Sequence, residues 1–128
     1  MSAKSNYLED KILDYVLRDT ADWAPSAVYL ALHTADPGEA GTGTEVSGNG
    51  YSRQAVTFAA ASSGSSSSNS VEEFTASGGA FGTVTHFGIW DASSSGNLLY
   101  YGALTASKTI ADGDTLRFAS GAITITEA

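Results

Sequence analysis

The chain has 128 residues, of which 42% are hydrophobic and 16% charged, so it has the length and composition of one globular domain with a buried core. Its formal net charge is −8 and its six Lys and Arg residues are dispersed, which argues against a nucleic acid or an anionic membrane as the partner. The absence of cysteine excludes a disulfide scaffold and a thiolate metal site. With neither a signal peptide nor an apolar run of membrane-spanning length, the sequence predicts assembly in the cytoplasm and no membrane contact.

The pattern of residues 6–19 predicts a helix. This helix belongs to an N-terminal segment that covers residues 1–22. Asn6 is predicted as the N-cap, with Glu9 three residues later in a capping-box arrangement. The apolar positions recur at helical spacing: Leu8, Ile12, Leu13, Tyr15, Val16 and Leu17. We expect this stripe to pack on the domain's own core; the alternative is that part of it docks on a neighbouring subunit.

Beyond residue 25 the apolar pattern alternates with a two-residue period, which is typical of strands. The predicted strands cover residues 28–33, 53–58, 71–75, 83–90, 98–104, 108–110, 115–118 and 122–126. The pair Asp112-Gly113 predicts a hairpin turn, and the last strands are expected to form a β-meander. Residues 34–50 and the Ser-rich residues 59–70 are predicted as extended surface loops. The sequence therefore predicts a single antiparallel β-sandwich domain over residues 1–128, with seven or eight strands and one N-terminal helix.

Within residues 83–90 the alternation assigns side chains to two faces of the strand. One face is predicted to carry Val84, His86, Gly88 and Trp90, and the other Thr85, Phe87 and Ile89. Because a small sandwich needs large residues in its centre, Trp90 and Phe87 are expected in the core.

The sequence shows no set of residues suited to catalysis. His33 and His86 lie in the middle of predicted strands, and no adjacent motif supplies a nucleophile. Neighbouring carboxylates such as Glu72 and Glu73 point to opposite faces of a strand, so they do not form a catalytic pair. EF-hand, Walker A and dinucleotide-binding patterns are missing. We therefore expect no enzymatic activity, no cofactor and no metal site.

Exposed apolar and acidic positions are the candidates for an interface with other proteins. Tyr100 and Tyr101 are adjacent on a strand and face opposite sides, so at least one of them is expected outside the core. The acidic loop of residues 34–50 suits a partner with a basic patch. The complete set of candidate interface residues is Leu8, Ile12, Tyr15, Asp36, Glu39, Glu45, Tyr100 and Tyr101.

Several sequence strings resemble a family of small bacteriophage virion proteins. They lie at residues 5–9, 11–13, 28–34, 50–54, 83–91 and 96–102. Members of this family are labelled tail-fibre or minor tail proteins, and similar small β domains serve as capsid decoration proteins. The strings contain no catalytic motif.

The resemblance implies a non-enzymatic structural protein on the surface of a virion. Because the chain has no fibre repeat or heptad pattern, the reading we favour is a capsid decoration (cement) protein that binds the outer capsid surface. The alternatives are a tail-fibre or minor tail protein involved in host attachment, and a carbohydrate-binding accessory module. The implied partners are the major capsid protein or tail proteins, together with further copies of the chain in a homo-oligomer.

Overall fold

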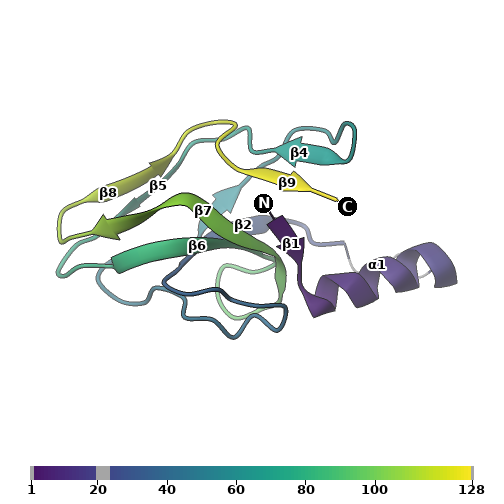
Figure 1. Cartoon of the computed structure of the whole chain (residues 1–128), viewed down its shortest axis with the longest axis horizontal. Coiled ribbons are helices and arrows are strands. Elements are labelled where there is room, and N and C mark those ends of the chain that lie inside the picture. The colour runs from purple at the N-terminus through teal and green to yellow at the C-terminus, as the bar shows by residue number, and fades with distance from the viewer. Residues whose placement is uncertain (1, 20–23, 128) are drawn as a thin grey trace.

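The structure is a computed structural model that describes residues 2–19 and 24–127. Over these residues the chain forms one helix and nine strands (Figure 1). The elements are β1 (Ser2–Lys4), α1 (Asn6–Arg18), β2 (Val28–His33), β3 (Gln54–Val56), β4 (Ser65–Ser67), β5 (Glu72–Thr75), β6 (Gly82–Trp90), β7 (Leu98–Ile110), β8 (Thr115–Phe118) and β9 (Thr124–Thr126). The prediction of an antiparallel β fold with one N-terminal helix is confirmed. The short strands β1 and β4 raise the number of strands in the described part above the seven or eight expected.

The strands form two packed layers. One layer is a five-stranded antiparallel sheet with the order β1-β7-β6-β2-β3. The pairs β5-β8 and β4-β9 lie along one side of this sheet in Figure 1. Buried side chains from both layers meet between them, including Leu30, Leu32, Ile89, Phe74, Leu116 and Ile125. The hydrophobic core therefore lies between the large sheet and the two short pairs.

Irregular pairing between β6 and β7 changes the predicted assignment of the β6 faces. Val84 lies opposite Lys108 and His86 lies opposite Ala103, so the extra residues at this step belong to β7. Val84 lies in the core together with Phe87, although the two are three residues apart. The predicted alternation is therefore wrong for Val84. The expectation of a core position is confirmed for Phe87, whereas Trp90 is half-buried outside the core cluster.

The predicted C-terminal meander is also wrong. Residues 98–110 form the single strand β7, β8 pairs with β5, and β9 pairs with β4. The Asp112-Gly113 turn does form, but it carries the chain from one layer to the other. There the Gly113 amide donates to the Ala76 carbonyl at 2.9 Å. Turn residues specify a local reversal of the chain and do not specify which strand lies beside the next one.

Each of the two stretches predicted as loops pairs with a neighbouring strand. In the Ser-rich residues 59–70, β4 pairs with β9, and Ser66 lies opposite Ile125. The hydroxyl of Ser66 donates to the Ala59 carbonyl at 2.6 Å, so serine side chains supply part of the local hydrogen bonding. Residues 34–50 fold back along β2, where the Val46 amide donates to the Leu32 carbonyl at 3.0 Å.

Helix α1 begins at Asn6, the residue that was predicted as its N-cap, so it starts one residue earlier than expected. It extends away from the body of the protein. Its N-cap is Ser5, whose hydroxyl accepts from the Leu8 amide at 3.2 Å, so Asn6 is the first helical residue and the predicted capping box is absent. Of the residues in α1, all of which are described, Leu8 alone is buried. The expectation that the apolar stripe packs on the core is therefore wrong beyond the first turns, and Figure 1 shows α1 extending away from the sheets. In the part of the chain described, no helix has the length and apolar character required to cross a membrane.

Candidate functional site

Arg53 is the centre of a polar network on the face of the large sheet that points away from the core. Its side chain is only 6% exposed and holds Glu45 through two bonds, Nε to Oε2 at 2.8 Å and Nη2 to Oε1 at 2.9 Å. Nη1 donates to the carbonyls of Ala92 and Ser95, both at 2.8 Å. One guanidinium group thus links the loop of residues 34–50 to the turn after β6.

The carboxylate of Glu45 is kept ionised by this network. Burial alone would raise the pKa of Glu45, but hydrogen bonds from Arg53 and from the Tyr51 hydroxyl, the latter at 2.6 Å, overcome this effect and lower it. Burial, followed by the hydrogen bond to Glu45, raises the pKa of Tyr51 well above its usual range. Glu45, a predicted interface residue, is therefore a structural partner of Arg53.

Trp90 contacts both His33 and the Arg53 guanidinium. The His33 and Trp90 rings are nearly parallel with centroids 6.1 Å apart, and Arg53 Cζ lies 4.1 Å from the Trp90 ring centroid. A sugar that stacks on tryptophan needs a free ring face, and the Arg53 guanidinium occupies one face of Trp90.

His33 has a structural environment. Burial lowers the pKa of His33 below its ordinary value of 6.5, so the neutral ring is favoured. Its Nε2 accepts a long hydrogen bond of 3.4 Å from Trp90 Nε1. Gly88 makes room for both rings, because a Cβ atom at this position would lie 2.8 Å from His33 Nε2.

The two adjacent tyrosines of β7 face opposite sides, as predicted. Burial first, and then the charges of Glu39, Asp36 and Glu9, raise the pKa of Tyr101. We call these four residues the Tyr101 face. It brings together three predicted interface residues, although Asp36 also accepts from the Gly38 amide at 2.9 Å in its own turn.

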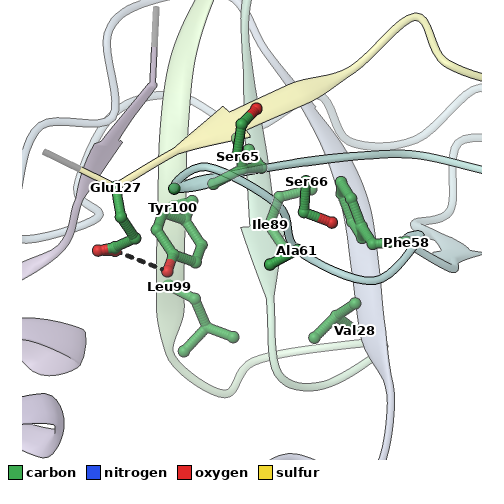
Figure 2. Close-up of a pocket in the computed structure, with 11 residues that line it drawn as sticks. Val28, Phe58, Ala61, Ser65, Ser66, Ile89, Leu99, Tyr100 and Glu127 are labelled. Carbon is green, nitrogen blue, oxygen red and sulfur yellow. Dashed lines mark hydrogen bonds between the residues drawn. The ribbon is translucent and has the colours of Figure 1, made fainter.

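Tyr100 lines an apolar pocket between the large sheet and the β4-β9 pair (Figure 2). The pocket has a volume of about 280 Å³. Its apolar walls are formed by Val28, Phe58, Ala61, Ile89, Leu99, Tyr100 and Ile125. At its rim the Tyr100 hydroxyl donates to Glu127 Oε1 at 2.9 Å, and Lys4 Nζ lies 3.2 Å from Glu127 Oε2. This geometry suits an apolar group, with polar contacts available at the edge.

Sequence reasoning did not find this pocket, because its walls come from segments far apart in the chain. Residues 61–66 contribute one wall and belong to the Ser-rich stretch, which carries no local signal of a cavity. The only sequence signal was the aromatic pair Tyr100-Tyr101, which indicated an interface near this strand.

Of the three predicted interface residues on α1, only Tyr15 is well exposed. Leu8 is 3% exposed and contributes to the attachment of α1, Ile12 is half-buried, and Tyr15 is 52% exposed. The helix also exposes Leu13, Val16 and Leu17, whose exposed fractions are 54%, 69% and 73%. We call these three residues the α1 ridge.

Across residues 2–19 and 24–127, no group of three or more His, Cys, Asp or Glu side chains is placed to hold a metal ion. The polar groups with the most contacts, Arg53 and Glu45, are engaged with each other and with the backbone. The Tyr101 face, the apolar pocket and the α1 ridge are features of the described part of the chain that could serve in recognition.

A family model described as podophage GP4 fiber I protein gp80 matches residues 3–126. The chain belongs to this family. It is therefore a phage fibre protein and a structural component of a virion. No curated protein matches the chain. The family supports the tail-fibre alternative better than the capsid decoration role that the sequence favoured, and it implies contacts with other virion proteins.

Proposed function

We propose that the protein is a non-enzymatic subunit of a fibre on the outside of the phage particle, and that it is held there by contacts with other virion proteins. The observation that carries this proposal is the match to a fibre protein family over residues 3–126. A structural role also agrees with the use of the polar groups. Arg53, Glu45 and His33 connect loops and strands and are not presented to a substrate.

The surface that we assign to attachment on the particle is the Tyr101 face. A tyrosine whose hydroxyl senses the charge of three carboxylates suits a basic patch on the partner, because tyrosine supplies contact area and the acidic groups supply charge complementarity. The net charge of −8 would strengthen the approach to such a partner at low salt.

Labelling of intact particles with a monovalent antibody fragment against this chain, followed by electron microscopy, tests the proposed location. Label along a fibre attached to the tail is the expected result. Label distributed over the capsid faces would contradict a location in a fibre and would favour the capsid decoration role.

The attachment surface has a separate test. Reversal of charge in the variant Asp36→Lys with Glu39→Lys should reduce incorporation into particles while the isolated protein keeps its circular dichroism spectrum. The matched control is Glu73→Lys, since Glu73 is exposed on β5 and lies outside the Tyr101 face. Equal incorporation of both variants would contradict the assignment of this surface.

A further inference from the structure

The side chain of His33 is buried with one of its two ring nitrogens unpaired. The residue is fully buried at the seam between β2 and the loop of residues 34–50. Among residues 2–19 and 24–127, its Nδ1 is the one buried side-chain nitrogen or oxygen that has no hydrogen-bond partner. Because a buried polar atom without a partner costs free energy, the surroundings of this ring are sensitive to any change in its protonation.

The contact with Trp90 decides which nitrogen of His33 carries the proton. An indole N–H can only donate, so Trp90 Nε1 donates to His33 Nε2 at 3.4 Å, and the proton of the neutral ring is on Nδ1. In the protonated ring both nitrogens are donors. Protonation would therefore place an N–H group of His33 against the N–H group of Trp90, and repulsion would replace the hydrogen bond.

The backbone of β6 prevents the two rings from separating toward the sheet. A Cβ atom at Gly88 would lie 2.8 Å from His33 Nε2 and 2.9 Å from Trp90 Nε1, so both nitrogens lie directly over this glycine. The Arg53 guanidinium occupies one face of the indole ring. Separation of the rings therefore displaces the histidine toward the loop of residues 34–50, which pairs with the end of β2.

The groups around His33 disfavour a positive ring. Burial has the largest effect and lowers the pKa of His33. Glu45 and the backbone of Gly43 act in the opposite direction, but both carboxylate oxygens of Glu45 already accept hydrogen bonds from Arg53. The charges of Arg53 and of His86, which lies opposite on β6, add to the effect of burial. A state in which water reaches the ring therefore binds the proton more readily than the closed state.

Two backbone hydrogen bonds close the loop of residues 34–50 against the end of β2. The Thr34 amide donates to the Thr44 carbonyl at 2.8 Å, and the Val46 amide donates to the Leu32 carbonyl at 3.0 Å. The histidine lies between these two bonds on β2. Opening of this short seam is thus the smallest change that exposes the ring to water.

We infer that protonation of His33 breaks its contact with Trp90 and releases the loop of residues 34–50 from the end of β2. This loop carries Asp36 and Glu39, so its release displaces two carboxylates of the Tyr101 face. The inference deepens the proposed function, because it makes the attachment surface sensitive to acid. The consequence for attachment rests on that proposed function, whereas the opening itself is a property of the purified chain.

Hydrogen exchange followed by NMR at pH 7.5 and pH 5.5 tests the opening. The protection factors of the Thr34 and Val46 amides should fall by about two- to tenfold at the lower pH, since an opening linked to one proton with an ordinary pKa of 6.5 changes by at most about tenfold over this range. They should also be about tenfold or more below those of residues 87–89, which are paired on both sides by β2 and β7. One common protection factor for both sets would overturn the inference, because global unfolding would then explain the exchange.

Variants at the two rings assign the effect to this contact. The changes His33→Gln and His33→Phe remove the titrating group in two different shapes, so the difference between the two pH values should disappear in both. The matched control His86→Gln, on the neighbouring strand, should keep it. Trp90→Phe removes the opposing N–H group and should raise the pKa of His33, followed through its ring resonances by NMR. A pH effect that persists without His33, a ring that titrates at or above 6.5 in the unmodified chain, or an unchanged pKa in Trp90→Phe would each overturn the inference.

Release from intact particles tests the consequence for attachment. Particles that carry the unmodified chain or His33→Gln are held at pH 7.5 and pH 5.5, and the chain in the supernatant is measured by immunoblot. We expect acid to release more of the unmodified chain than of the variant. Equal release would overturn the link between the loop and attachment. The location in a fibre is tested separately by the antibody label, so the two results can fail independently.

Discussion

The Arg53 network buries polar side chains, whereas helix α1 exposes apolar ones. Around Arg53, charged and aromatic side chains are buried and each contacts several neighbours, so they hold two loops against the sheet. Along α1, apolar side chains are left in solvent beyond a single buried anchor, Leu8. The polar region thus belongs to the stability of the fold, while the apolar helix is available for assembly. Residue type alone would have suggested the reverse.

The largest expected effect is the loss of Arg53. Its replacement by alanine leaves the Glu45 carboxylate without its main partner and removes the contacts to the carbonyls of Ala92 and Ser95. We expect a loss of about 3–5 kcal/mol in the free energy of unfolding, measured by urea denaturation. The control is Arg117→Ala, whose ion pair with Glu73 at 3.6 Å is exposed and should contribute about 1 kcal/mol or less. Equal losses in both variants would contradict the structural role of the network.

The second largest effect on the free energy of unfolding is expected for Leu8, which anchors α1. Truncation of Leu8 to alanine removes the only buried apolar side chain of α1 and should cost about 2–3 kcal/mol, as expected for a buried leucine near the edge of a core. Urea denaturation measures this loss, and loss of helical circular dichroism before the main transition would show that α1 detaches first. A change of less than about 0.5 kcal/mol would place Leu8 on the surface.

Acidification should weaken the folded state in two steps. The folded protein holds the pKa of His33 below 6.5, so the unfolded chain binds a proton more readily and stability falls as the pH drops through 6.5. The pKa of Glu45 is likewise below its ordinary value of 4.5, so a second loss follows as the pH falls below 4.5. Each step has a slope of at most about 1.4 kcal/mol per pH unit.

Urea denaturation of the protein at a series of pH values measures these slopes. The variant His33→Phe keeps an aromatic ring against Trp90 and should lose the step near pH 6.5 while keeping the one below pH 4.5. An unchanged profile in this variant would show that another group is responsible for the first step.

The smallest effect is expected on the α1 ridge. Leu17→Gln keeps a good helix former at a position that is 73% exposed, so the stability of the isolated chain should change by less than about 0.5 kcal/mol. Differential scanning calorimetry at low protein concentration measures this change without self-association. A loss of 2 kcal/mol or more, by the scale of a buried leucine, would mean that the ridge packs inside its own chain.

The local patterns of the sequence were sufficient for the fold class. The apolar spacing of residues 6–19 predicted α1, the alternation of residues 28–33 matched β2 residue for residue, and the prediction for residues 115–118 matched β8. These features depend on neighbours within one element, which a single sequence contains. The resemblance of a few strings to virion proteins was also sufficient for the class of particle.

Only the tertiary structure decided which surfaces are free. Val84 lies in the core next to an irregular step in the β6-β7 pairing, the strands after Asp112-Gly113 pair with β5 and β4, and α1 turns most of its apolar residues to solvent. Each of these outcomes depends on contacts between segments far apart in the chain. Periodicity reports which residues share a face of an element; what covers that face depends on where the other elements pack.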